Sequence, residues 1–387
     1  MIICDPAVCC GCMACADKCP HGAITPKKDK YGFVYPEIDA SVCTQCGACQ
    51  RTCPNNREFS SEAKKAYAAY NKNTEERLKS SSGGMFVLLA KAVLDEGGAV
   101  FGAGYDESFL PTHILCESKE TLSSLMGSKY AQSNTSGIWK KVKEQLEADL
   151  PVLFSGTPCQ CAALHSYLGR EYPKLLTVDF ICHGVPSQKL LQDYYSNTFT
   201  NIKSVAFRNK DKGWHCFSMK VEDDNGVYSQ TTAKDPYFRL FVRNAALRES
   251  CYNCSYKDDS YSSDITLGDF WGIGRVSPEM NDDKGISAVI IRSEKGQKAF
   301  DALSDSIVFS ECQAETIATV NPMLVRSTKK PPERERLMSC LAEGVPFDRI
   351  KEEFAIPASF GERVKNEVKH RLLTVYGAIV RLKKKLK

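Results

Sequence analysis

The first 55 residues contain one cysteine pattern twice, with the two copies 34 residues apart. In each copy three cysteines stand at every third position and a Cys-Pro pair closes the run: Cys9, Cys12, Cys15 and Cys19, then Cys43, Cys46, Cys49 and Cys53. Thiolates at this spacing can bind three corners of a 4Fe-4S cube, and the fourth cysteine of such a run binds the cube of the other copy. The pattern predicts one cube on Cys9, Cys12, Cys15 and Cys53 and another on Cys43, Cys46, Cys49 and Cys19.

The alternative to two cubes is a pair of zinc sites. Zinc sites use cysteines in pairs and do not need a third cysteine at constant spacing in both copies. Residues 5–55 also resemble the two-cluster bacterial ferredoxins, with both motifs intact. Cys4 and Cys10 lie outside the pattern, and we expect them to be packing residues.

The composition of the chain indicates the class of protein in which this chemistry takes place. The chain has 387 residues, of which 43% are apolar, enough for a packed core and more than one domain. A net charge of +4 does not indicate a nucleic-acid partner. No apolar run is long enough to span a membrane and residues 1–15 do not form a leader, so we expect a cytoplasmic protein. Its nineteen cysteines then point to metal ligation rather than disulfides.

The elements that must hold further cofactors lie after a polar linker at 55–62. Apolar periodicity predicts helices over 85–94, 138–146 and 159–168 and strands over 99–102, 151–154 and 175–182. Asp224-Asn225-Gly226 predicts a hairpin turn, and we expect this hairpin to make the sheet mixed. The pattern therefore predicts an α/β chain with α+β elements: a small ferredoxin-like domain (1–55), a mixed-sheet body (65–330) and a helical tail (331–387).

The end of the chain differs in charge from the rest. Residues 362–387 contain nine basic and two acidic residues, a net charge of +7. Apolar residues recur at three- or four-residue intervals from Val364 to Leu386, which predicts a basic amphipathic helix. We expect this stripe to pack on the body or on a second copy; peripheral contact with anionic lipid is the alternative.

Single-electron clusters need a flavin if the body is to reduce an organic molecule by hydride transfer. Gly272-Ile273-Gly274 does not continue as a dinucleotide fingerprint, so a Rossmann site is not predicted. Ser80-Ser81-Ser82-Gly83-Gly84 opens a helix, where free N–H groups suit a phosphate. Gly127-Ser128-Lys129-Tyr130 places a lysine and an aromatic ring next to a glycine. A helix cap and a surface turn are the alternatives for these two segments.

The order of six motifs carries a family resemblance. They are Ser81 to Gly84, Gly127 to Tyr130, Phe154 to Gln160, Ile181 to Ser187, Cys251 with Cys254, and Asp264 to Gly272. Over about 65–330 the chain resembles the coenzyme F-420 hydrogenase/dehydrogenase β-subunit family of iron-sulfur flavoproteins. The resemblance implies FAD, with contacts from Ser82, Gly83, Gly84, Gly127, Ser128, Lys129, Tyr130, Gly156, Thr157 and Pro158. Asp269 and Trp271 are expected in the pocket wall; a buried turn residue and a core aromatic are the alternatives.

A third cluster is expected in the body. Cys251 and Cys254 supply two corners of a cube, and Cys159 and Cys182, each at the end of a predicted strand, are candidates for the others. The family resemblance also implies a cluster here. Cys161 is the substitute if Cys159 is wrong, and a redox dithiol or half a zinc site is the alternative for the pair.

Acid and base groups are scarce in these motifs. Lys129 is a candidate to stabilise the anion of a reduced flavin or to hold an acidic substrate, and His183 is a candidate acid or base. A structural role is the alternative for both.

We therefore expect a ferredoxin-linked, flavin-dependent reductase. Electrons from reduced ferredoxin or a redox partner subunit would pass through the 4Fe-4S clusters to FAD and on to a small-molecule substrate. One alternative is a deazaflavin (coenzyme F-420) oxidoreductase. The other is an electron-transfer subunit of a larger complex, without a substrate site of its own.

Overall fold

The computed structural model describes residues 2–356. The amphipathic helix predicted over 362–387 lies outside the described residues. None of the helices within 2–356 is long and apolar enough to cross a membrane.

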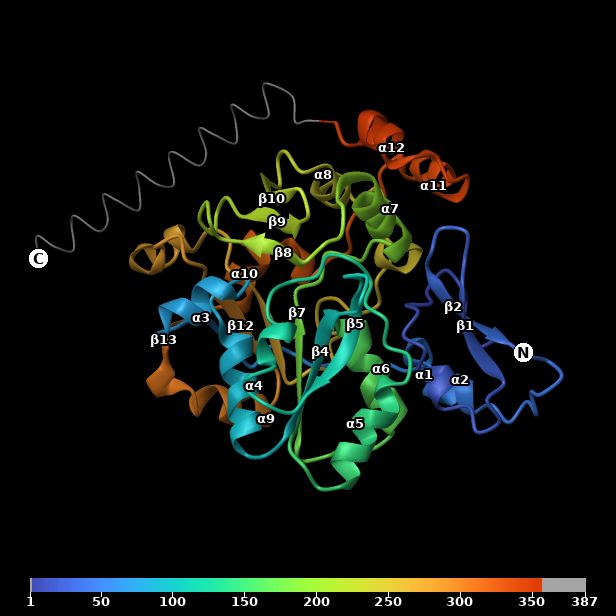
Figure 1. The fold of residues 1–387 in the computed structure, drawn as a ribbon. Coiled ribbons are helices and arrows are strands. Elements are labelled where there is room, and N and C mark those ends of the chain that lie inside the picture. The colour runs from blue at the N-terminus through green and yellow to red at the C-terminus, as the bar shows by residue number, and fades with distance from the viewer. Residues whose placement is uncertain (1, 357–387) are drawn as a thin grey trace, which may run out of the picture.

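The body is built on one eight-stranded mixed sheet (Figure 1). Its strand order is β13-β3-β12-β11-β7-β6-β4-β5. The strands are β3 (Lys65–Asn71), β4 (Ala99–Tyr105), β5 (Pro111–Cys116), β6 (Val152–Gly156), β7 (Leu175–Phe180), β11 (Ile265–Asp269), β12 (Ser287–Ile291) and β13 (Ile307–Cys312). The central strands β11, β7, β6 and β4 run parallel, and the flanking pairs are antiparallel. The predicted α/β architecture with a mixed sheet is confirmed.

Helices cover both faces of this sheet, which explains why its central strands are buried along most of their length. Every residue of β12 is buried, as a strand covered on two faces requires. On one face lie α4 (Met85–Asp95) and α9 (Glu294–Asp301); on the other lie α5 (Ile138–Glu147) and α6 (Pro158–Leu168) (Figure 1). Two further short helices are α3 (Thr74–Lys79) and α10 (Ala314–Val320).

A second, three-stranded antiparallel sheet lies apart from the first. It consists of β8 (Ser204–Asn209), β9 (Ser218–Asp223) and β10 (Gly226–Thr231), with the predicted turn between β9 and β10. The expectation that this hairpin makes the main sheet mixed was wrong. The main sheet is mixed because β5 at one edge and β12, β3 and β13 at the other pair in antiparallel fashion.

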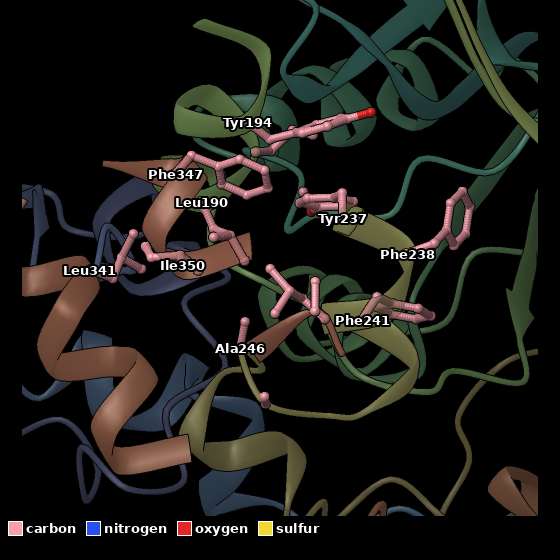
Figure 2. Close-up of a cluster of buried hydrophobic side chains, with 14 of the residues drawn as sticks. Leu190, Tyr194, Tyr237, Phe238, Phe241, Ala246, Leu341, Phe347 and Ile350 are labelled. Atoms are coloured by element: carbon pink, nitrogen blue, oxygen red, sulfur yellow. The ribbon is translucent and has the colours of Figure 1, made fainter. Parts of the chain in front are cut away.

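A helical layer closes over the second sheet. It comprises α7 (Gln188–Thr198), α8 (Pro236–Val242), α11 (Arg334–Ala342) and α12 (Phe347–Phe354). Figure 2 shows how side chains from these helices meet: Phe347 of α12 lies by Tyr194 of α7, with ring centroids 5.2 Å apart. The first part of the predicted tail thus packs into the core of the body. Phe238 and Phe241 of α8 belong to the same core and help to form the cavity described below.

The N-terminal module lies beside α5 and α6 (Figure 1). It contains α1 (Ala14–Asp17), the hairpin β1 (Ile24–Lys28) and β2 (Val34–Ile38), and α2 (Ala48–Thr52). Its two halves repeat in backbone conformation as well as in sequence. Positive φ angles occur at Gly11 and Met13 in the first copy and at Gln45 and Gly47 in the second. The two cysteine loops therefore follow the same path.

Candidate cofactor site

A cavity of about 530 Å³ opens where the central strands end. Its floor is formed by the carboxyl ends of β6, β7 and β11, where ligands gather in open α/β sheets. Phe217, Phe238 and Phe241 from the second layer form part of its wall. The volume lies in the usual range for cofactor sites.

The cavity brings together nearly all the residues predicted for the body. The four candidate ligands of the third cluster line it, as do His183, Asp269, Trp271 and the flavin-contact candidates other than Gly83. Gly83 lies beneath the surface, with its N–H donating to Ser287 Oγ at 3.0 Å. Cys161 is fully buried and packs with α5 rather than facing the cavity. Between Cys159 and its substitute, the geometry favours Cys159.

The four body cysteines come from three separate segments. Cys159 lies in the first turn of α6, Cys182 follows β7, and Cys251 and Cys254 lie in and after a short 3-10 helix. Burial, together with the nearby thiols of Cys159 and Cys254, raises the pKa of Cys182 to about 12. The Cys10 thiol and burial raise the pKa of Cys159. Such thiols ionise when a metal binds them, so the donor set fits an iron-sulfur cube.

The predicted cubes of the module have matching geometry. A small cavity of about 20 Å³ is lined by Cys19 together with Cys43, Cys46 and Cys49, so the cross-copy set meets in space. The other set, Cys9, Cys12, Cys15 and Cys53, is buried. In residues 2–356 no three His, Cys, Asp or Glu side chains converge as ligands of one metal ion. A 4Fe-4S cube does not require its protein ligands to converge on one ion, because each thiolate binds a different iron.

The two predicted flavin loops are joined to each other. Ser81 Oγ accepts hydrogen bonds from Ser128 N at 2.7 Å and from Ser128 Oγ at 2.8 Å. Gly84 has φ 85° and caps the N-terminus of α4, whose first residues, Met85 and Phe86, line the cavity. The loops thus form one continuous wall that suits a phosphate or a ring edge.

Arg208 ties this wall to the Asp269 motif, and sequence reasoning missed it. Its guanidinium binds Asp269 at 2.7 and 3.1 Å and also donates to Tyr130 Oη and Ser81 O at 3.1 Å each. Trp214 Nε1 donates to the same carboxylate at 3.0 Å, and its ring stacks on Trp271. Arg208 Nε has no hydrogen-bond partner among the described residues. A buried donor of this kind fits a cofactor oxygen.

Asp179 is a second residue that sequence reasoning missed. It lines the cavity and is 1% exposed, yet neither carboxylate oxygen has a well-formed hydrogen bond in the described part of the chain. Burial raises its pKa to about 7, although the nearby Thr266 hydroxyl opposes the rise. The sequence does carry a signal for this residue, because Asp179 is the one acidic residue in β7, a strand that is mostly apolar. Asp179 can therefore exchange a proton near neutral pH.

Lys129 and His183 both line the cavity but already have partners. Lys129 Nζ donates to Ser124 O at 3.2 Å and Met126 O at 2.9 Å, and burial lowers its pKa to about 7. His183 Nε2 pairs with Asn244 Oδ1, and burial lowers its pKa. Each is held in place, which suits a positioning role as well as a chemical one.

The module presents its first cysteine loop to the cavity. Cys10 and Cys12 line the cavity, and the Cys10 thiol lies between those of Cys12 and Cys159. Body side chains bind the loop carbonyls: Thr135 Oγ1 and Trp139 Nε1 both donate to Cys12 O, at 2.9 and 2.8 Å. The first predicted cube therefore lies next to the predicted body cube.

Paired with a doubled cysteine module, this site defines an iron-sulfur oxidoreductase. Residues 150–316 match the family described as the C terminus of the coenzyme F420 hydrogenase/dehydrogenase beta subunit, and residues 8–56 match the 4Fe-4S dicluster domain. Residues 150–316 are therefore similar to the C-terminal region of this beta-subunit family, and they follow a region that matches a 4Fe-4S dicluster domain. The family resemblance predicted from the sequence is confirmed over these residues.

Two similar proteins come from species of Methanosarcina. The chain is 25% identical over 324 residues to the F subunit of the F(420)H(2) dehydrogenase of Methanosarcina mazei, in a match that covers 79% of this chain and 84% of that protein. A chain from the F420-reducing [NiFe] hydrogenase complex of Methanosarcina barkeri matches with a TM-score of 0.46 and 20% identity, covering 76% of this chain and 91% of its own length.

Proposed function

We propose that the cavity binds FAD beside a 4Fe-4S cube, and that the chain passes electrons between its clusters and an organic hydride partner of that flavin. The supporting observation is the shared cavity, which is lined by the four body cysteines, both flavin loops and the first cysteine loop of the module. A relay of single electrons works only when successive centres are close together.

The residues of the wall have distinct parts in this proposal. The N-terminus of α4 and the Ser82 to Gly84 loop hold the phosphates, and Arg208 and Lys129 supply cationic donors for the anionic cofactor. Asp179 holds or releases a proton at its carboxylate. When bound, the flavin exchanges single electrons with the clusters and a hydride with an organic partner.

The order of the clusters follows from exposure and contact. Cys46, in the predicted second cube, is exposed, whereas Cys12, in the first, packs with Trp139 and Phe154 of the body. We propose that a redox partner, either ferredoxin or a partner subunit, meets the second cube. The first cube then connects it to the body cube on Cys159, Cys182, Cys251 and Cys254.

The hydride partner has two candidates. As a reductase, the chain takes electrons from reduced ferredoxin and reduces a small organic substrate. A deazaflavin is the second candidate, favoured by the names of the matched family and of the Methanosarcina mazei relative. In that case reduced coenzyme F-420 would reduce the bound flavin, and electrons would leave through the clusters of the module to a partner subunit.

One experiment tests both the cofactor content and the identity of the electron donor. The anaerobically purified full chain should carry about twelve irons, as three cubes of four, and should bind FAD. Reduced ferredoxin and reduced coenzyme F-420 are then mixed separately with the loaded protein while the flavin absorbance is followed. Reduction of the flavin by either donor supports the proposed electron relay. It also shows whether the electrons enter through the clusters or from the deazaflavin. Zinc in place of iron, or a protein that does not bind FAD, would overturn the proposal.

A further inference from the structure

Arg248 is a buried cation at the junction of the module and the body. It is 1% exposed and lies in the cavity wall after α8. Its guanidinium reaches into the module: Nε donates to Cys9 O at 2.7 Å and Nη2 donates to Val34 O at 3.0 Å. Its third partner, Gln132 Oε1, lies in the body at 3.1 Å.

All of these acceptors are neutral. Within residues 2–356 the hydrogen bonds of Arg248 include none to a carboxylate, and its guanidinium also lies over the rings of Phe33 and Tyr35. A guanidinium keeps its charge at any ordinary pH, so burial without a counter-charge is costly. The position therefore calls for an anionic group that is not a side-chain carboxylate.

The nearest such group in the proposed function is the first cube. Cys9, whose carbonyl Arg248 binds, is one of its predicted ligands, and a cube held by four thiolates carries a net negative charge that grows on reduction. The fit is close: a Cβ added to Gly11, in the same loop, would stand 2.7 Å from Arg248 Nη1.

Lys257 offers a parallel at the body cube. It is 9% exposed, and its ammonium donates to Cys182 O and to Met323 O at 2.6 Å each. Here too a buried cation binds the carbonyl of a predicted ligand. Lys257 acts on the thiols of Cys182 and Cys254 in the body cube, whereas Arg248 acts on Cys9 of the first cube and also on Cys159. Lys257 therefore serves as a control for a cation that faces the body cube alone.

We infer that Arg248 is a positioning residue that docks the first cube against the body and, through its charge, stabilises the reduced form of that cube. This inference rests on the proposed function. A single electron enters the cube during reduction, and no bond breaks. The guanidinium stays protonated throughout, so no proton accompanies the electron at this residue.

The test is a redox titration of the full chain with dithionite, followed by electron paramagnetic resonance, on protein with its iron content measured. In Arg248→Met we expect one module cube to have a lower midpoint potential, with the second cube unchanged. Arg248→Lys, which keeps the charge, should restore most of the midpoint. Lys257→Met should lower the midpoint of the body cube instead. Thr135→Val, which removes a neutral hydrogen bond to the Cys12 carbonyl without touching Arg248, should leave all midpoints near their original values.

If Arg248→Met loses iron, Arg248→Gln keeps N–H donors without the charge and should show the same fall. Unchanged midpoints in a fully loaded Arg248→Met or Arg248→Gln protein would overturn the inference, as would equal shifts in Arg248→Lys and Arg248→Met. Both results leave the proposed function standing. Absence of iron from the unaltered chain would instead remove the proposed function itself.

Discussion

At the scale of single residues, the site depends on thiols and charges that are far apart in the chain. The four body cysteines are half-buried and lie close enough for their thiols to raise one another's pKa values, although they span positions 159 to 254. Cys161, two residues from Cys159, points into the core instead. This pair allows a direct comparison, because both cysteines lie in α6.

Cys254→Ala should remove the body cube. We expect iron to fall from about twelve to about eight per chain, with FAD still bound and its reduction by ferredoxin lost. Iron analysis and stopped-flow absorbance measure the two effects. Cys161→Ala, the matched control, should retain full iron. If Cys254→Ala keeps its iron and its electron transfer, the pair at 251 and 254 is a dithiol or a structural feature.

Lys129 should make FAD binding depend on pH. Burial lowers its pKa to about 7, so in the free protein the ammonium is lost as pH rises above that value. An anionic cofactor binds the protonated form better, so affinity should fall from pH 7 to pH 9 by up to about tenfold per unit. Fluorescence titration with FAD at each pH measures this affinity.

Two variants separate charge from shape at this position. Lys129→Met should bind FAD weakly with little pH dependence, and Lys129→Arg should bind it with little pH dependence but nearly full affinity at pH 7. A flat profile between pH 6 and pH 9 in the unaltered protein would show that Lys129 does not contact the anion.

At the scale of elements, the loop before α4 is confined by the sheet beneath it. A Cβ on Gly83 would stand 2.4 Å from Ala69 O and 2.7 Å from Ser287 N, in β3 and β12. Both atoms belong to the backbone of paired strands, so neither can move without disturbing the sheet. This explains the glycine in a loop whose neighbours line the cavity.

Gly83→Ala should therefore destabilise the protein by about 3 kcal/mol, the upper end for overpacking. FAD affinity should fall with it, because the Ser82 to Gly84 loop must shift. Gly102→Ala is the control, since its Cβ would meet only the Leu125 side chain at 3.6 Å, and we expect a change within about 1 kcal/mol. Urea denaturation of the loaded protein gives both values; equal stabilities would refute the packing argument.

At the scale of the whole molecule, the module and the body share one packed interface. Cys12 and Ala14 belong to the same core cluster as Trp139 and Phe154, and Gly137 N donates to Asp17 Oδ1 at 3.1 Å. The division into residues 1–55 and 65–330 stays a prediction about sequence units. In space, the first cysteine loop is part of the cavity wall.

The basic end of the chain gives a prediction at this scale. Its apolar stripe over 364–386 must be covered, while a net charge of +7 stays in water. Truncation after position 360 should lower solubility or change the oligomeric state if the stripe packs on protein. Gel filtration and vesicle flotation with anionic lipid compare the two forms. Loss of vesicle binding in an otherwise soluble, folded protein would favour the membrane alternative.

The sequence alone identified the cysteine module and the family resemblance of the body. Thiolate spacing along the chain is set by the geometry of a cube, so Cys9, Cys12 and Cys15 are recognisable without any fold. The strand and helix pattern of the body was also readable, because periodicity reports which faces are buried. The placement of the hairpin was not, because pairing between strands depends on distant partners.

Only the tertiary structure decided which residues meet. Arg208 stands in no motif, and its importance comes from its contact with Asp269, 61 positions away. Asp179 likewise matters because the fold buries it in the cavity wall. The choice of Cys159 over Cys161 depends on which side of α6 faces the cavity. Arg248 binds Cys9 across 239 positions. Local sequence specifies local geometry. The electrostatic field around a buried charge, and its access to solvent, instead depend on the distant residues that the fold places beside it.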